Sequence, residues 1–356
     1  MQILRFAQND SLHCEEARNA IIGCHLEIAM AKPYRVLAVT NMWPNEADPS
    51  FGSFVQDQLE SLRPLGVNYD VLFVNGRKSR WNYLLGIGEV RRRLRARKYD
   101  LIHAHFGLSG WVARFQLRAP LVITFHGDDV LGRPARDGHI TPMGRLFQAS
   151  SYLLAPLASA VVVQNREMRR VLRLESAEVI PCGIDLELFH PMDPGEARRV
   201  AGLDPRKKYV LFAYNPKEAR KRFDLIEAAV AKAKEQLPQL EILQVRGKPH
   251  SEMPLYMNAA DLLVMASMIE GSPLAVREAM ATNLPVVSVD VGDVADLIYE
   301  SDGNYIVPRD ADVMAAKIVE LCRRGERSHG RERLIPYSLP ATAKRILEVY
   351  ARVTRS

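Results

Sequence analysis

Two glutamates flank a segment that its own residues predict to be the start of a helix. The segment reads Glu270-Gly-Ser-Pro-Leu-Ala-Val-Arg-Glu278. Ser272 is a favoured N-cap residue and Pro273 a favoured first helical residue, so the backbone N–H groups that follow should be left unpaired. Unpaired N–H groups at a helix start bind anions such as phosphate. The segment therefore predicts a phosphate site with a carboxylate on each side.

The two carboxylates suit sugar hydroxyls, because a carboxylate only accepts hydrogen bonds and a vicinal diol can donate two. Glu278 lies five residues beyond Pro273, roughly 7.5 Å along a helix axis, whereas Glu270 lies in the preceding loop. One glutamate would bind a transferred sugar and the other a ribose. The residues expected to hold the diphosphate between them are Gly271, Ser272 and Pro273, with the amides of Leu274, Ala275 and Val276.

Two carboxylates beside a diphosphate repel it, so the site needs cations. Arg220 and Lys221 follow the predicted strand Tyr209–Tyr214 and can supply them. They could also stabilise the charge that builds on a leaving phosphate. The alternative is a solvated basic loop. We favour the functional interpretation because ligands of parallel sheets gather at the carboxyl ends of strands.

A histidine marks the end of another predicted strand. His126 follows Leu121–Thr124 and precedes a glycine, so we expect it at the mouth of a cleft, in contact with the reacting sugar. A lone histidine is more often structural, and that alternative stays open. Asp128 and Asp129, which follow it, are interpreted as helix-start or loop residues rather than as a metal-binding pair.

His103 and His105 end the predicted strand Leu101–Ala104 and should share one face of it. A metal site would need a third ligand at a defined spacing, and the sequence offers none, so packing or hydrogen bonding is the favoured role. No metal and no cofactor are predicted.

Gly52 opens a predicted helix after the first strand, Arg35–Val39. A glycine there would let the backbone approach a diphosphate closely, and an ordinary N-terminal turn is the alternative. Gly86-Ile-Gly88 is no dinucleotide fingerprint, because Arg91 stands where the third glycine would be and no strand precedes it. This disfavours a nucleotide-dependent oxidoreductase.

Short apolar runs alternate with amphipathic segments from Tyr34 onward, which is typical of βαβ units and predicts an α/β fold with two Rossmann-like halves. The expected strands of the first half are Arg35–Val39, Tyr69–Val74, Leu101–Ala104, Leu121–Thr124 and Ala160–Gln164. Those of the second half are Tyr209–Tyr214, Glu241–Val245, Leu262–Ala266, Pro285–Val289 and Asn304–Val307.

The turn-rich stretch Val179–Pro191 predicts a linker between the halves. We expect residues 1–33 to be a poorly ordered extension outside the fold, with Met30 as an alternative start. The first domain would span residues 34–185 and the second, the donor domain, 186–338. Residues 339–356 have a helical apolar stripe and should pack back on the first domain.

Composition narrows the class of protein. The 356 residues carry a net charge of +6, which favours anionic partners, but nucleic-acid binding would rest on this charge alone and is not predicted. The four cysteines show no paired spacing, so a reducing, cytoplasmic setting is expected. The longest apolar run, Leu153–Val163, is too short to span a bilayer.

One segment has its own charge pattern. Arg77 to Lys98 contains nine basic residues and one acid, Glu89, with Trp81 and Leu84 among them. Basic residues mixed with aromatic and aliphatic ones at helical spacing predict a helix on an anionic membrane surface, and so peripheral attachment to the inner face of the cytoplasmic membrane. A solvated basic helix is the equal alternative.

The paired glutamates in their context resemble the donor motif of retaining glycosyltransferase family 4, the group 1 glycosyl transferases. Ala279-Met-Ala and Leu284 to Asp293 extend the likeness, as do the linker and Thr124 to Gly127. The short sequences Glu-Gly-Ser-Pro and Asp-Val-Gly-Asp are most similar to those of bacterial enzymes of teichuronic acid and exopolysaccharide biosynthesis.

The resemblance implies a GT-B fold, a nucleoside-diphosphate sugar donor (a UDP- or GDP-sugar), retention of configuration and no metal. The acceptor would be a glycan or a lipid-linked glycan, bound by the first domain. Glu270 would hold the transferred sugar, Glu278 the ribose and Lys221 the diphosphate, with His126 near the anomeric carbon. His126 and Glu270 are therefore the expected catalytic residues.

The chain departs from the family pattern in three places. The usual Gly-Arg is replaced by Ala213-Tyr214, the usual Lys-Gly by Lys221-Arg222 and the usual Gly-Gly by Gly292-Asp293. Arg220 is the candidate replacement for the missing arginine. These changes motivate an alternative function, a catalytically inactive GT-B-like partner in a polysaccharide assembly complex.

Overall fold

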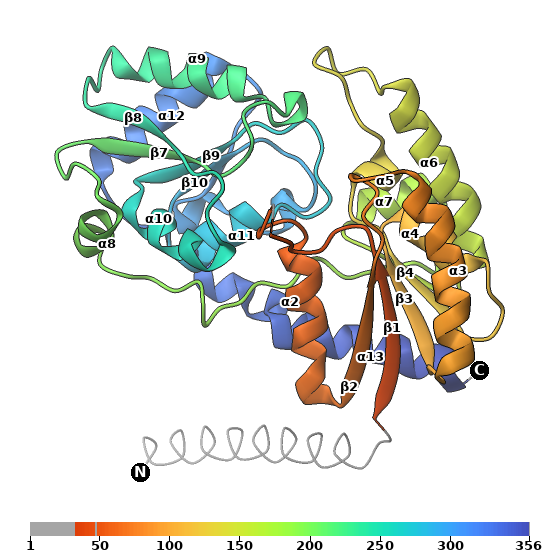
Figure 1. The fold of residues 1–356 in the computed structure, drawn as a ribbon. Coiled ribbons are helices and arrows are strands. Elements are labelled where there is room, and N and C mark those ends of the chain that lie inside the picture. The colour runs from red at the N-terminus through yellow and green to blue at the C-terminus, as the bar shows by residue number, and fades with distance from the viewer. Residues whose placement is uncertain (1–32, 47, 356) are drawn as a thin grey trace, which may run out of the picture.

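The computed structural model describes residues 33–46 and 48–355, and the expected extension, Met30 included, lies outside them apart from Pro33 (Figure 1). The strands are β1 (Tyr34–Thr40), β2 (Val67–Phe73), β3 (Leu101–His105), β4 (Leu121–Thr124), β5 (Ala160–Val163), β6 (Glu178–Val179), β7 (Lys208–Phe212), β8 (Leu240–Gln244), β9 (Leu262–Met265), β10 (Val286–Ser288) and β11 (Tyr305–Ile306). The α-helices are α2 (Ser53–Leu62), α3 (Trp81–Ala96), α4 (Gly107–Arg114), α5 (Asp128–Leu131), α6 (Pro142–Leu154), α7 (Arg166–Leu172), α8 (Pro194–Ala201), α9 (Phe223–Lys234), α10 (Met253–Ala259), α11 (Leu274–Ala281), α12 (Ala311–Arg324) and α13 (Leu339–Arg355).

The strands form two parallel sheets, one in each half of the molecule, with the orders β2-β1-β3-β4-β5-β6 and β11-β10-β9-β7-β8. Short 3₁₀ helices complete the fold, at Arg63–Leu65, Ala155–Leu157, Ala219–Lys221, His250–Glu252, Val294–Asp296, Glu300–Asp302 and Gly330–Tyr337. The expected pair of Rossmann-like halves is confirmed.

Strand β1 shows why a run of apolar residues predicts a strand in this chain. Val36 and Ala38 point to the face that α2 and α13 cover, while Leu37 and Val39 point to the opposite core. All four are fully buried. A parallel strand covered on both faces needs apolar residues at successive positions, without polar alternation.

The predicted linker begins inside the first sheet, which corrects one expectation. Glu178–Val179 forms β6 and pairs with β5. Two residues are too few to show a period in the sequence. Farther along, Ile184 donates its amide to the Tyr337 carbonyl (2.9 Å) and accepts from the Leu339 amide (2.9 Å), so the two segments that connect the halves run side by side.

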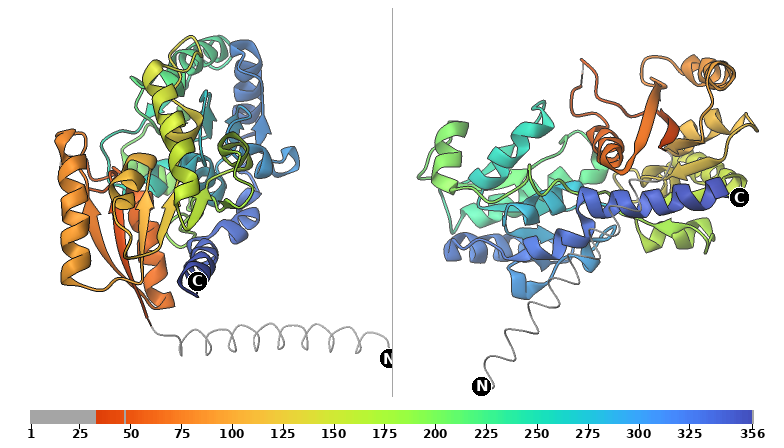
Figure 2. Two further views of the ribbon diagram at one scale, coloured as in Figure 1. Left: turned by 90° about the vertical axis from the view of Figure 1, so that its right-hand side faces the viewer. Right: turned by 90° about the horizontal axis from the view of Figure 1, so that it is seen from below.

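Helix α13 leaves the second half and packs beneath the first sheet (Figure 2). It buries Ala343, Ile346, Val349 and Val353 there, and its Tyr350 hydroxyl lies 2.7 Å from His103 Nδ1 on β3. The expected return of the C-terminal helix is confirmed. Within the described part of the chain, no helix is both long and apolar enough to cross a bilayer.

Candidate donor site

The site lies where the strand order of each sheet reverses. Neighbouring strands leave their helices on opposite sides at these points, between β1 and β3 in one sheet and between β7 and β9 in the other, which opens a crevice at the carboxyl ends. The β1 end leads to Gly52 and the β3 end to His105. The β7 end leads to Arg220 and Lys221, and the β9 end to Glu270. The expected site residues thus come from both crevices.

Glu270 binds both candidate cations. Its Oε1 lies 2.5 Å from Lys221 Nζ and its Oε2 3.4 Å from Arg220 Nη1. Tyr214 completes the setting, because the Lys221 ammonium sits 3.6 Å above its ring. Burial works to raise the pKa of Glu270, but the charges of Lys221 and Arg220 outweigh it and hold that pKa below its usual value. Glu270 is therefore a fixed, ionised acceptor.

Arg220 also reaches across to the first half. Its Nη2 lies 3.1 Å from Glu218 and its Nε 3.9 Å from Asp128, which begins α5. The guanidinium therefore faces carboxylates of both halves, and its role in place of the missing arginine stays a prediction.

Arg222 explains how the chain does without the usual glycine after Lys221. Its backbone has φ 50° and ψ 47°, the left-handed conformation that glycine adopts without strain. The loop has therefore kept the glycine geometry with an arginine, whose guanidinium pairs with Asp224 at 3.1 Å. Lys221 is presented toward Glu270 in spite of the substitution.

Glu278 is bound by a histidine that the sequence did not single out. His250 Nε2 lies 2.7 Å from Glu278 Oε1, and His250 Nδ1 lies 3.7 Å from Asp57 on α2 of the other half. Burial lowers the pKa of His250, but the hydrogen bond to Glu278 and the charge of Asp57 outweigh it and raise that pKa. His250 therefore holds one oxygen of Glu278.

The start of α11 differs from the prediction. The helix begins at Leu274, and Pro273, not Ser272, is its N-cap residue. Ser272 Oγ accepts from Arg277 Nη1 (2.6 Å) instead of capping the helix, and the Val276 amide donates to the Pro273 carbonyl (3.2 Å). The amides of Leu274 and Ala275 remain the ones a phosphate could use.

A buried ion pair holds this helix start. Arg277 is fully buried, and its guanidinium contacts both carboxylate oxygens of Asp293, which is 4 % exposed. Asp293 stands where the family usually has a second glycine. We therefore treat Arg277 and Asp293 as one ion pair. Arg277 holds the Ser272 hydroxyl, and Asp293 directly follows Gly292, whose backbone has a φ of 65°.

His126 follows β4 as expected, and His105 touches it. His105 Nδ1 lies 3.3 Å from His126 Nε2, and the Phe54 ring meets His126 edge-on at 5.0 Å between centroids. Burial lowers the pKa of His126 to about 3, so its imidazole is neutral. His126 Nδ1 is buried and has no hydrogen-bond partner among the described residues.

His103 and His105 are hydrogen-bonded core residues, as predicted. Their rings lie 4.2 Å apart on one face of β3, and His103 bonds Thr124 and Tyr350, each at 2.7 Å. Among the residues the structure describes, no group of three His, Cys, Asp or Glu side chains could hold a metal ion.

Asp129 shapes the backbone around His126. Its carboxylate accepts from the amides of Gly107 (3.1 Å), His126 (3.1 Å) and Gly127 (2.9 Å). Asp128 is the first residue of α5. The interpretation of both aspartates as helix-start or loop residues is confirmed.

Gly52 has two reasons to be glycine. It precedes α2 with φ 76°, and a Cβ there would come within 2.4 Å of the Met42 carbonyl carbon. Its role toward a diphosphate stays a prediction. The contact of Phe54 with His126 places this helix start beside the crevice.

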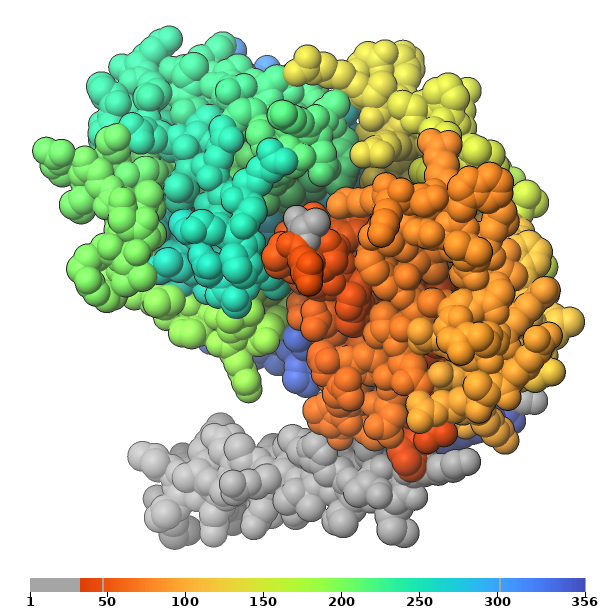
Figure 3. Space-filling view, viewed as in Figure 1, coloured from red at the N-terminus to blue at the C-terminus, as the bar shows by residue number. Residues whose placement is uncertain are grey.

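The two halves meet at the glutamate loop. A Cβ on Gly271 would approach the His126 carbonyl oxygen within 2.4 Å, and one on Gly127 would approach the Gly271 nitrogen within 3.0 Å. Asn165, which follows β5, donates from Nδ2 to the Gly271 carbonyl (2.6 Å). On the face shown in Figure 3 the start of the first half lies against the second half, where His250 contacts Asp57 of α2.

Asn165 and His250 are the contacts that sequence reasoning missed. Both follow the carboxyl end of a strand, the signal that singled out His126.

A hollow of about 410 Å³ opens along the same boundary, between Arg136 and the segment Pro216–Asp224.

The buried histidines predict a loss of stability in acid, which Asp129 partly offsets because burial raises its pKa to about 7 and the folded chain takes up that proton first. Burial lowers the pKa of His103 to about 3 and that of His105 well below its usual value. The unfolded chain takes up these protons near pH 6.5 and the folded chain does not, so stability is present above that pH and lost below it. Each histidine contributes a slope of about 1.4 kcal/mol per pH unit. Urea denaturation between pH 7 and 4.5 measures it.

The control for that slope is His105→Phe, which removes one titrating group and keeps a ring. The acid slope of the free energy of unfolding should become shallower by about 1.4 kcal/mol per pH unit. An unchanged slope would show that His105 is not held neutral.

Two parallel-sheet halves, with Glu270 bound to Lys221 and Arg220 at the loop where they meet, define an α/β protein of two Rossmann-like domains, and comparisons identify its family. The profile of Glycosyltransferase Family 4 matches residues 29–188, and that of Glycosyl transferases group 1 matches residues 207–324. The chain belongs to glycosyltransferase family 4 and has the GT-B fold.

Curated relatives include the putative teichuronic acid biosynthesis glycosyltransferase TuaC of Bacillus subtilis, 30 % identical over 62 % of this chain and 60 % of that protein. The amylovoran biosynthesis glycosyltransferase AmsK of Erwinia amylovora is 27 % identical over 69 % and 65 %. The matched region thus spans less than two thirds of these relatives.

Solved structures share the fold. Sucrose-phosphate synthase of Thermosynechococcus elongatus superposes with a TM-score of 0.74 at 20 % identity, covering 91 % of this chain and all of that one. Anabaena Alr3699/HepE, solved with UDP and glucose, gives 0.66 at 16 % identity, covering 90 % and 99 %.

Proposed function

We propose that the protein is a retaining glycosyltransferase that moves a sugar from a UDP- or GDP-sugar to a glycan or lipid-linked acceptor in cell-surface polysaccharide synthesis. The observation that carries the proposal is Glu270, ionised and held by Lys221 and Arg220 at the loop where the halves meet. The relatives named for teichuronic acid and amylovoran biosynthesis support the polysaccharide setting.

The donor would lie with its diphosphate at the start of α11. Leu274 and Ala275 offer amides, and Lys221 and Arg220 can turn from Glu270 toward the phosphates. Glu270 accepts from hydroxyls of the transferred sugar and Glu278 from the ribose diol. The contact of Anabaena HepE with UDP-glucose is the structural precedent in the same fold.

The reaction would be a displacement on the face that the leaving group departs from. The bond from the anomeric carbon to the diphosphate oxygen breaks as the acceptor oxygen bonds to that carbon, and the acceptor proton passes to the leaving phosphate. Lys221 and Arg220 stabilise the charge on that phosphate. His126, neutral, provides a hydrogen-bonding nitrogen near the sugar. No metal is required by this scheme.

A cytoplasmic setting and a membrane contact through Arg77–Lys98 belong to the same proposal, because a lipid-linked acceptor is presented at a bilayer surface. Ion pairs within the structure neutralise part of the positive charge of this segment. Arg92 and Arg93 both bond Glu89, and Arg97 bonds Asp70. The unpaired part of the positive charge therefore lies elsewhere on the helix.

Glu278→Gln should weaken donor binding about 10-fold or more, because one oxygen replaced by an amide can no longer accept from the ribose diol. Turnover at saturating donor should change less than KM, since the ribose is remote from the reacting carbon. Steady-state kinetics separate the two. The control is Glu252→Gln on the neighbouring 3₁₀ helix, which should change neither.

The direct test of the donor site is a thermal-shift screen with uridine, guanosine and adenosine diphosphate sugars. A ligand that binds only the folded protein raises its melting temperature. One nucleotide class should raise the Tm of the wild type and do so less for Glu278→Gln. No shift with any class would remove the proposed donor. A shift without sugar transfer would favour an inactive binding partner.

A further inference from the structure

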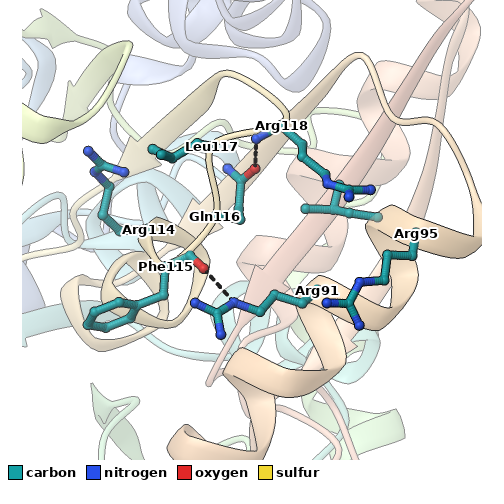
Figure 4. Close-up of a pocket in the computed structure, with 8 residues that line it drawn as sticks. Arg91, Arg95, Arg114, Phe115, Gln116, Leu117 and Arg118 are labelled. Atoms are coloured by element: carbon teal, nitrogen blue, oxygen red, sulfur yellow. Dashed lines mark hydrogen bonds between the residues drawn. The ribbon is translucent and has the colours of Figure 1, made fainter.

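A second hollow lies on the first half, apart from the glutamate site. It has a volume of about 600 Å³ and lies between the last turns of α3 and the segment that ends α4 (Figure 4). Four arginines line it, and the described residues that line it include no acid. They are Arg91, Arg95, Arg114 and Arg118.

Hydrogen bonds hold Arg91 and the loop that follows α4. Arg91 Nε donates to the Phe115 carbonyl (2.9 Å), and Gln116 Oε1 accepts from the amides of Arg118 (2.7 Å) and Ala119 (3.0 Å). The Nε of Arg114 is buried and has no hydrogen-bond partner among the described residues. These contacts order the hollow and leave guanidinium donors for an anion.

Exposed apolar side chains continue from the arginines. Trp81, Leu84 and Leu85 are 72 %, 59 % and 69 % exposed. At helical spacing they share one face of α3 with Arg91 and Arg95, which are ten and fourteen residues beyond Trp81. On the other side of the hollow Leu117 is 87 % exposed, in the loop that Gln116 orders.

We propose that this arginine hollow binds the phosphate of an anionic phospholipid headgroup, with Trp81, Leu85 and Leu117 inserted among the lipids around it. The proposal rests on the membrane contact within the proposed function and gives that contact a site. Clustered guanidinium groups match phosphate, and a rim of exposed Trp and Leu matches the apolar boundary beneath headgroups.

Other anionic partners fit less well. A nucleic-acid strand would need aromatic rings on which bases stack, and Phe115 is the aromatic residue among the described lining of the hollow. A soluble nucleotide would leave Leu117 and the apolar face of α3 in water. A bilayer uses the charge and the apolar surface together.

The test is co-sedimentation of the full chain with vesicles of phosphatidylcholine alone and of phosphatidylcholine mixed with phosphatidylglycerol. The protein should sediment with the mixed vesicles and stay in solution with the neutral ones. Replacing Arg91, Arg95, Arg114 and Arg118 with serine should weaken partitioning at least about 100-fold, since each basic residue near an anionic surface contributes roughly a fivefold factor.

The matched control removes the same charge from the second half, by serine at Arg199, Arg206, Lys232 and Lys234, which are exposed. It should retain most of the binding. Equal loss in both variants, or none in the arginine variant, would overturn the proposal. Leu117→Asp supplies an independent variant and should weaken binding without touching the arginines.

The donor-induced thermal shift separates this site from the proposed function. The arginine variant and Leu117→Asp should show the wild-type shift with the nucleotide sugar, because neither change is near Glu270 or Glu278. Inorganic phosphate at the concentration of the lipid phosphate should not displace the vesicles, since it offers no apolar phase; full displacement would assign the hollow to a soluble anion and overturn the membrane proposal.

Discussion

Glu270→Gln is expected to lower the rate of sugar transfer by at least about 100-fold while the protein stays folded. The amide keeps the shape of the side chain but loses the charge that orders Lys221 and Arg220, each of which contacts one Glu270 oxygen. It also loses one acceptor for the hydroxyls of the transferred sugar. The sugar would then be bound with its anomeric carbon less well placed, so turnover should fall more than donor affinity. Initial rates of nucleoside-diphosphate release measure both.

The matched control is Glu218→Gln. Glu218 also contacts Arg220, at 3.1 Å, but it lies nearer solvent and outside the loop where the halves meet. Its loss should change turnover only a few-fold. If Glu270→Gln turned over at nearly the wild-type rate, or if both variants lost activity alike, Glu270 would not be the sugar-side residue.

Asp293→Gly is expected to lower the free energy of unfolding by about 3–5 kcal/mol, because it leaves the guanidinium of Arg277 buried without its carboxylate. Arg277→Met should also be costly, because it leaves the carboxylate of Asp293, which is 4 % exposed, buried without its cation. The start of α11 would also lose the hydrogen bond that holds Ser272. Urea denaturation of each variant measures the loss.

The double variant Arg277→Met with Asp293→Gly is the control. It brings back the usual family glycine and removes both charges, so it should be much more stable than Asp293→Gly alone. Losses that simply add would show that Arg277 and Asp293 do not act as a pair.

Most strands could be predicted because a buried parallel strand consists of consecutive apolar residues. The expected Leu121–Thr124 is β4 itself, and the other nine expected strands overlap observed ones. β6 was missed, since two residues carry no pattern. The candidate site was predictable where it depends on strand ends: Glu270, Lys221 and His126 all follow strands that a sequence can show.

The rest depended on contacts between distant residues. Ser272 looks like an N-cap residue, but a buried guanidinium five residues later takes its hydroxyl. His250 reaches Glu278 from the end of another strand. Two departures from the family pattern are explained only by the structure. Arg222 adopts the left-handed backbone conformation of the glycine it replaces, and Asp293 pairs with Arg277.

The most direct test of the central claim, that the glutamate loop forms a working donor site, is nucleoside-diphosphate release from a panel of UDP- and GDP-sugars, with and without a lipid-linked glycan, followed by NMR of the anomeric proton in the product. The account predicts that one donor is consumed in an acceptor-dependent reaction, that the new linkage keeps the anomeric configuration of the donor, and that Glu270→Gln abolishes the signal. Inversion of configuration, or release that does not depend on Glu270, would contradict it.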